Sequence, residues 1–458
     1  MLRPAVVASY GPLIEQVTDD FIDILKRKKT IDDLQMTLSN YTTESVAMLC
    51  FNRRLGSIAS EEPAEIVKCV SEMFTLLQKS MIMPFKTFKY FKTPLYKQAE
   101  MVRLRIQNIV EKELKAQLDV LNELKKENQL DDYLQKDPNF MYSLLADSRM
   151  TLGKITSIVT TLINAGIDST ANSMLFALSD LAFHQEKQQK LYQEIQTVVG
   201  DSKHLTKEHL AQMSFLKACI KESQRLTFPI MTGPARYMEW DTVVGGYTIP
   251  RKTLVSPDMA AMVKDERFFP KAKEYIPERW LRNVNDDITK GQEFPFAFKP
   301  FGFGPRGCIG QRFAEMEMQI GITKIIQNFE ISMPPGVSEI KTVHRTFTSP
   351  AQKENKRLKM TYFVLLTVLT VVIVPEVLTR SMPLLPHACL PCQSGACSGF
   401  DFINECMNPD GSCVGHMEEM FDPLCACIVM KSPLGDRANV VVLKEGNKSL
   451  KQTQPLFV

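Results

Sequence analysis

The residues best suited to chemistry lie in FGFGPRGCIG, residues 301–310, where one cysteine shares ten positions with four glycines and an arginine. Cys308 can bind a metal as a thiolate, and a nearby positive charge and a helix N-terminus both favour the thiolate. Arg306 supplies the charge, and a helix is predicted to begin near Gln311. The glycines let the main chain approach a flat partner closely. A thiolate with this clearance suits haem, and the alternative is a buried free cysteine in a glycine-rich turn.

Two further motifs precede this stretch. KESQRL contains Glu222 and Arg225 at an ExxR spacing, and residues 277–280 read PERW. By itself, ExxR would equally describe a solvated helix face. FGFGPRGCIG satisfies FxxGxRxCxG in full, and the three motifs in this order resemble those of the cytochrome P450 family.

The resemblance implies roles for several residues. A haem b would have its iron bound by the Cys308 thiolate, with Phe301 and Gly310 among the cofactor-binding positions of the loop. Arg306 and Arg236 would pair with the haem propionates, because arginine is well suited to carboxylates. A surface salt bridge is the alternative for Arg236. The ion-pair network that steadies the cysteine loop would consist of Glu222, Arg225 and Arg279.

AGIDST, residues 165–170, lies within a long apolar helix predicted over residues 151–182. By resemblance, this is the kinked helix that crosses the haem, where small residues leave space for dioxygen. Asp168, Ser169 and Thr170 are the catalytic candidates, because an acid and hydroxyls inside an apolar helix favour a polar site or a proton relay. An ordinary helix kink is the alternative. Most family members carry threonine where this chain has Ser169.

Within the family, the sequence is most similar to the animal mitochondrial group, whose electrons come from a small acidic ferredoxin. CIGQRFAEMEM and LKACIKE carry this resemblance. Lys217 and Lys221 lie one helical turn apart and could dock an acidic partner in fast, salt-sensitive encounters; a solvated lysine pair is the alternative. The resemblance also implies peripheral association with the mitochondrial inner membrane on its matrix side, although no targeting peptide is visible.

The elements that must position these residues are mostly helical. Residues 1–150 contain apolar residues at helical spacing, as in LIEQVTDDFIDILKRKK, and DTVVGGYTIP predicts a strand pair that turns at Gly245 and Gly246. The predicted fold is mainly α, a helical bundle with small β-sheets as in the cytochrome P450 family, with the haem between residues 151–182 and the Cys308 loop. The 458 residues carry a formal net charge of +3 and no basic block, which argues against a nucleic-acid partner.

Both ends of the chain depart from the family. The resemblance begins at Met1 and covers a partial haem domain, residues 1–350, without the family's N-terminal segment and first strands. Residues 351–388 read as a basic linker and a short apolar segment that resembles a signal peptide. The tail, residues 389–458, places seven cysteines within 39 residues, a density typical of a disulfide-stapled secreted domain, with zinc binding as the alternative. We expect residues 360–458 to derive from an unrelated secretory sequence.

Two functions compete on these patterns. The first is a haem-thiolate monooxygenase that inserts one oxygen atom of O2 into a lipophilic, sterol-like or other lipid substrate, with electrons from a ferredoxin-type donor. Thiolate ligation would promote O–O cleavage. The alternative is a secreted disulfide-rich binding module in the tail, fused to a non-functional oxygenase remnant. Several linked motifs support the monooxygenase and only cysteine density supports the binding module, so the monooxygenase is our prediction.

Overall fold

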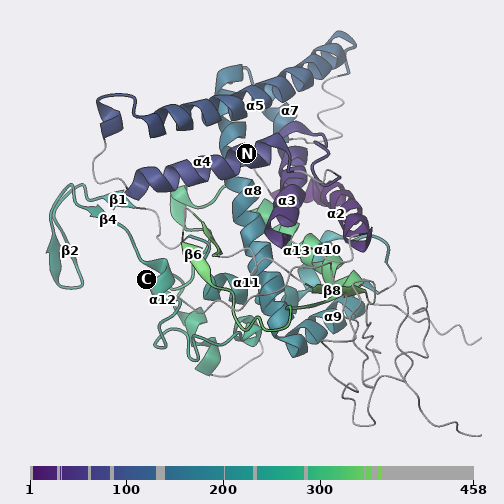
Figure 1. Cartoon of the computed structure of the whole chain (residues 1–458), viewed down its shortest axis with the longest axis vertical. Coiled ribbons are helices and arrows are strands. Elements are labelled where there is room, and N and C mark those ends of the chain that lie inside the picture. Colours follow the sequence, from purple (N-terminus) through teal and green to yellow (C-terminus); the bar gives the residue numbers. More distant parts are fainter. Residues whose placement is uncertain are drawn as a thin grey trace, which may run out of the picture. The chain divides into compact units, whose positions relative to one another are not determined.

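A computed structural model describes residues 4–27, 31, 33–59, 63–82, 87–129, 140–200, 202–230, 235–282, 287–344, 347–351 and 359–362 (Figure 1). The predicted Cys-rich tail lies outside these residues, as does most of the predicted linker before it.

The elements are mainly helices, as predicted. The α-helices are α1 (Pro4–Ser9), α2 (Gly11–Arg27), α3 (Leu34–Phe51), α4 (Glu65–Ile82), α5 (Pro94–Lys126), α7 (Phe140–Leu145), α8 (Leu152–Phe183), α9 (Gln185–Val199), α10 (Lys207–Gln212), α11 (Ser214–Leu226), α12 (Met259–Met262) and α13 (Gln311–Asn328). Short 3-10 helices are η1 (Thr87–Lys89), η2 (Pro277–Trp280), η3 (Asp287–Glu293) and η4 (Gly304–Arg306).

The strands form small antiparallel pairs. They are β1 (Arg236–Tyr237) with β4 (Leu254–Val255), β2 (Thr242–Val244) with β3 (Tyr247–Ile249), β5 (Phe329–Ser332) with β8 (Lys359–Tyr362), and β6 (Thr342–His344) with β7 (Thr348–Pro350).

The predicted hairpin in DTVVGGYTIP is confirmed by β2 and β3. Val244 pairs with Tyr247, so the turn consists of two glycines. Gly245 and Gly246 have φ of +58° and +87°, the left-handed values that a two-residue hairpin turn of this kind requires at both positions.

The long helix α8 lies at the centre of the described helices and packs along α3 (Figure 1). It begins where Thr151 accepts a hydrogen bond from the Lys154 N–H, so the observed start agrees with the predicted one. Gly166 of α8 permits the close approach of α3, because a Cβ there would lie 2.9 Å from Val46 Cγ2. Side chains of α8 are therefore held against a fixed neighbour on one side and face the Cys308 loop on the other.

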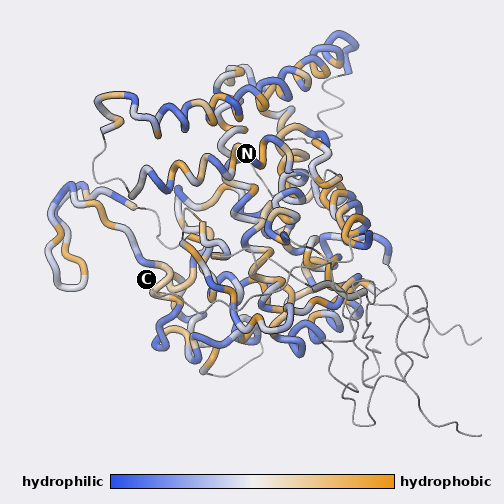
Figure 2. Tube along the Cα trace, viewed as in Figure 1, coloured by the Kyte–Doolittle hydropathy of each residue, from blue (hydrophilic) through white to orange (hydrophobic). Residues whose placement is uncertain are grey.

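Helices outside this centre bury one apolar face. In α2, Ile14, Val17, Phe21 and Leu25 are buried at helical spacing, as predicted, and Ile24 is half-buried. Hydrophobic and hydrophilic positions alternate along α4 and α5 in the same way (Figure 2). In the described part of the chain, no helix combines the length and hydrophobicity needed to span a bilayer.

Candidate active site

The Cys308 loop, residues 301–310, folds back on itself just before α13. The Cys308 N–H donates to the Phe301 carbonyl oxygen at 2.8 Å, which closes the loop. Gly302 and Gly304 have φ of +69° and +68°, a region that side chains disfavour. Two of the motif glycines are thus explained by the backbone. The cysteine side chain, in turn, is exposed to a cavity instead of being packed into the core.

Opposing effects act on the pKa of the Cys308 thiol. Burial raises its pKa above the ordinary value, and the backbone N–H groups of Gly310 and Gln311 lower it in part, whereas Glu315 adds to the rise. The predicted effect of the helix N-terminus is therefore present, but burial outweighs it. Arg306 lines the same cavity. A cation bound at the sulfur would tip the balance to the thiolate.

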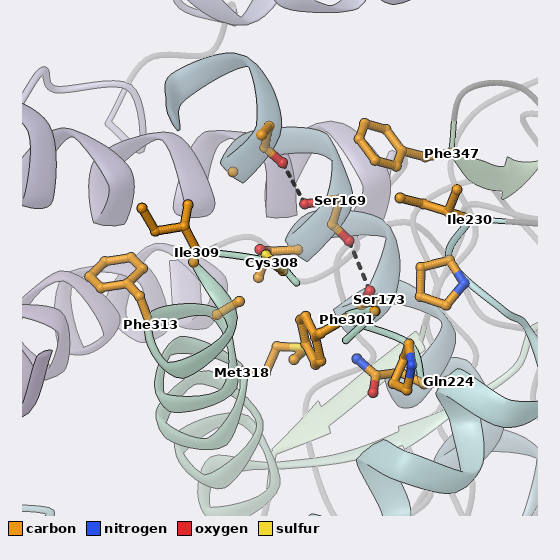
Figure 3. A pocket seen from close by; sticks show the side chains of 18 of the residues that line it. Ser169, Ser173, Gln224, Ile230, Phe301, Cys308, Ile309, Phe313, Met318 and Phe347 are labelled. Carbon is orange, nitrogen blue, oxygen red and sulfur yellow. Dashed lines mark hydrogen bonds between the residues drawn. The ribbon is translucent and has the colours of Figure 1, made fainter. Parts of the chain in front are cut away.

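A cavity of about 440 Å³ lies between the Cys308 loop and α8 (Figure 3). Its wall is mostly apolar, and on α8 it includes the small residues Ala165 and Gly166. The structure brings most of the predicted site residues to this wall. They are Ser169, Thr170, Phe301, Arg306, Cys308 and Gly310.

The three candidates in AGIDST are not equivalent. Ser169 Oγ donates to the Ala165 carbonyl oxygen at 2.5 Å, so its proton is already bonded within α8. Thr170 also lines the cavity and is buried. Asp168 is not among the lining residues, and burial raises the pKa of its carboxyl to about 6. A residue one step before Ser169 on a helix points about 100° away from it, which places the acid beside the cavity wall instead of on it.

The two arginines predicted to pair with propionates also differ. Arg306 lines the cavity, two residues before Cys308. Arg236 lies on β1, is exposed, and donates to the carbonyl oxygen of its own neighbour, Ala235, at 2.9 Å. Arg236 is not among the residues that line the cavity, so its predicted role is without geometric support here.

Glu222 on α11 is fully buried, and both of its carboxylate oxygens are bonded. Oε1 accepts from Arg279 Nε at 2.8 Å, from Arg225 Nη2 at 2.9 Å and from the Ile276 N–H at 3.0 Å. Oε2 accepts from Arg225 Nε at 3.0 Å and from Trp280 Nε1 at 2.9 Å. Buried charges are tolerated when paired and hydrogen-bonded in this way. Both guanidiniums also donate to carbonyl oxygens, those of Val263, Ala272, Glu274, Pro270, Lys271 and Ile288.

A buried acid on α8 joins this network to the central helix. Ser223 Oγ donates to Asp180 Oδ2 at 2.5 Å. Burial raises the pKa of Asp180 to about 7, Glu222 adds to the rise, and Ser223 and Arg225 oppose it. The ExxR helix is therefore fixed to α8 as well as to η2.

The two lysines predicted to dock a partner both lie on α11, but they differ in exposure and in hydrogen bonding. Lys217 is half-buried and its Nζ donates to the Ala211 carbonyl oxygen at 2.9 Å. Burial lowers the pKa of Lys217, Glu194 opposes this, and the charge on Lys221 lowers it further. Lys221 is exposed, with Nζ 5.8 Å from the centroid of the Trp280 ring. Lys221 is the more accessible of the two cations.

Sequence reasoning missed four polar residues that line the cavity, Ser173, Gln224, Lys299 and Glu317. Glu317 is fully buried, and neither carboxyl oxygen has a hydrogen-bond partner among the residues that the structure describes. Burial raises its pKa well above the ordinary value. Helical spacing could have identified Gln224, because a position two residues after Glu222 lies about 200° around the helix and faces away from the ion pairs.

These residues fit a haem. The wall offers a thiol on a glycine-rich loop, small side chains opposite it on α8, an arginine suited to a carboxylate and an otherwise apolar lining. Within the described ranges, no three His, Cys, Asp or Glu side chains gather into a metal site. The donor set therefore suits a cofactor that brings its other metal ligands with it.

Comparison with known proteins agrees with this geometry. The family model described as Cytochrome P450 matches residues 1–359. A probable mitochondrial cytochrome P450 12a5 of Drosophila melanogaster is 30% identical over 349 residues, which is 72% of this chain and 64% of the fly protein. A mitochondrial sterol 26-hydroxylase of Rattus norvegicus is 30% identical, covering 78% of this chain and 68% of the rat protein.

A mitochondrial 25-hydroxyvitamin D-1 alpha hydroxylase of Rattus norvegicus is also 30% identical, covering 76% of this chain and 70% of that protein. The chain thus spans 64% of the length of the fly relative, slightly less than two thirds. The match to the family model extends over most of the chain and includes the Cys308 loop, the ion-pair network and α8. This chain belongs to the cytochrome P450 family and resembles its mitochondrial members.

Proposed function

We propose that this chain acts as a haem-thiolate monooxygenase, which inserts one oxygen atom of O2 into a lipophilic substrate. The observation that carries the proposal is a single cavity with Cys308 on one wall and the small side chains of α8 on the opposite wall. The names of the rat relatives, a sterol 26-hydroxylase and a 25-hydroxyvitamin D-1 alpha hydroxylase, favour a sterol-like or related lipid substrate.

Cys308 would bind the iron of a haem b, with Phe301, Arg306 and Gly310 contributing to the same wall. When bound, the haem supplies the chemistry of dioxygen activation, and the thiolate donates electron density to it. Arg306 would hold a propionate through its charged N–H groups. The mostly apolar lining would exclude water and accept the hydrocarbon part of a lipid.

Proton delivery would involve the hydroxyl groups on α8. Thr170 lines the cavity. The Ser169 hydroxyl donates its hydrogen bond to the Ala165 carbonyl oxygen, so it can donate to a ligand in the cavity only if this bond is broken. Asp168 has a pKa of about 6, raised by burial, so its carboxyl can gain and lose a proton near neutral pH. In this arrangement Asp168 holds the proton beside the wall, and Thr170 or Ser169 presents it to the cavity.

Electrons would come from a ferredoxin-type donor. Lys221, with Lys217 one turn before it, offers positive charge on an exposed part of α11 to an acidic partner. Similarity to mitochondrial relatives favours a mitochondrial location, on the matrix side of the inner membrane, with peripheral membrane association.

A carbon monoxide difference spectrum of the reduced, haem-supplied chain tests the proposal. We expect a strongly red-shifted Soret band that is lost in Cys308→Ser and kept in Cys219→Ser, because Cys219 is buried on α11 and does not line the cavity. The same band in Cys308→Ser, or none in the folded parent chain, would contradict the proposal.

A further inference from the structure

The side-chain amide of Gln224 is buried and turned into the Cys308 cavity. Gln224 is 5% exposed and lines the cavity, and its amide points into it (Figure 3). An amide carries two N–H donors and a carbonyl acceptor. Among the residues that the structure describes, no hydrogen bond to this amide is present. The amide atoms are not among the fully buried unbonded atoms of the described residues, so they are accessible from the cavity and can hydrogen-bond to a ligand there.

The position of Gln224 follows from α11. Glu222 and Arg225 face the ion-pair network, and Ser223 bonds to Asp180 on α8. Gln224 points in the one remaining direction, toward the space between α11, α8 and α13. The motif that anchors the helix therefore also fixes the direction in which the Gln224 side chain leaves α11.

The wall around Gln224 offers little to bond with. Phe301 and Met318 are apolar, and the nearest polar residue along α8 in this part of the wall is Ser173. Ser173 Oγ donates its proton to the Ser169 carbonyl oxygen at 2.8 Å. Because the wall offers the amide few hydrogen-bond partners, a ligand that fills the cavity can hydrogen-bond to it.

We propose that Gln224 contacts the periphery of the haem and presents its N–H groups to it, which favours the reduced form of the cofactor. The inference rests on the proposed function. Reduction adds one electron, supplied by the ferredoxin-type donor in that function, to a haem that already has an anionic sulfur ligand. N–H donors directed at this electron-rich group stabilise it, and hydrogen bonding near a haem is one of the means by which proteins set its potential.

The test is a redox titration of the haem-loaded chain and of Gln224→Met, which keeps the length of the side chain and removes the N–H groups. We expect the variant to be about tenfold harder to reduce, a fall of about 59 mV for one electron. Gln193→Met, the same change at an exposed position on α9, should leave the potential unchanged. Gln224→Asn retains a shorter amide and should give an intermediate potential.

A second measurement separates this role from a structural one. Unfolding of the haem-free chain should show Gln224→Met to be at least as stable as the parent, because the variant removes no hydrogen bond made among the described residues. A variant that is less stable without haem would overturn the inference, as would an unchanged potential. If the parent shows the Cys308-dependent carbon monoxide band and the potential does not move, only this inference fails. Absence of that band would remove the proposed function and the inference together.

Discussion

On one face of α11, Glu222 and Arg225 are buried with every charged group bonded, whereas on the opposite face Gln224 is buried and its amide makes no hydrogen bond among the described residues. Glu317 of α13 extends the contrast, because it is as deeply buried as Glu222 and neither of its oxygens has a partner among the described residues. Where all buried charged groups have hydrogen-bond partners within the protein, the region is complete without a ligand. Where polar side chains at a cavity lack such partners, as Gln224 and Glu317 do among the described residues, we infer that a bound cofactor supplies them.

The largest effect in this comparison is expected from Glu222→Gln. The change leaves two buried guanidiniums facing a neutral amide, and breaking a buried ion pair in this way costs about 3–5 kcal/mol. Denaturant unfolding of the haem-free chain measures the loss. Arg149→Gln, at an exposed ion pair with Asp147, is the control and should cost far less, because exposed ion pairs contribute little to stability. Equal losses in the two variants would refute the structural role of the network.

Trp280→Phe should have a smaller effect in the same region. It removes the indole N–H that donates to Glu222 Oε2 at 2.9 Å but leaves both arginines in place. A hydrogen bond to a charged group contributes about 1.5–3 kcal/mol. The same unfolding experiment provides the measurement, and a variant as stable as the parent would show that the indole is dispensable.

Asp180, which is joined to the ion-pair network through Ser223, makes the stability of the fold sensitive to pH. Its folded pKa of about 7 lies well above the ordinary value for an aspartate, chiefly because of burial. The stabilising effect of its proton is therefore complete below the unfolded pKa and is lost as the pH rises toward 7. Across that window, the difference in unfolding free energy between the parent and Asp180→Asn should change by up to about 1.4 kcal/mol per pH unit. Parallel pH profiles for the two proteins would contradict this expectation.

Glu317→Gln is expected to change stability least. Burial raises the pKa of Glu317 well above its ordinary value and so favours the neutral form of the side chain. The Ser45 hydroxyl opposes the shift only in part, since it donates to the Tyr41 carbonyl oxygen at 3.2 Å. Because the neutral form is favoured, an amide of the same shape should change stability much less than Glu222→Gln does. A loss close to that of Glu222→Gln would mean that Glu317 is charged and paired.

The sequence motifs predicted the ion-pair network and the Cys308 loop well, because the residues that define each motif are the ones that bond there. Glu222, Arg225 and Arg279 meet in one network, and two of the four loop glycines, Gly302 and Gly304, take backbone conformations that explain their presence. The helices and the hairpin at Gly245 followed from periodicity and turn chemistry. These features depend on contacts between residues that are close in the sequence, or between residues that belong to recognisable sequence motifs.

The cavity side was less accessible to sequence reasoning. Gln224 lies within the ExxR motif yet is one of its variable positions, and Glu317 lies on α13, nine residues after Cys308 and outside the loop motif. Whether such residues face a cavity depends on how α8, α11 and α13 pack together. For the same reason, the sequence could not separate Asp168 from Ser169, or Arg306 from Arg236, in their access to the cavity.

The most direct test of the central claim is hydrogen exchange of the chain with and without haem. If the α8–Cys308 cavity is the haem site, peptides covering residues 162–173 and 301–318 gain protection on binding, and Cys308→Ser reduces that gain. Peptides from residues 263–282, which the ion pairs already hold, should be protected without haem and change little. Haem-induced protection elsewhere, with residues 301–318 unaffected, would contradict the account.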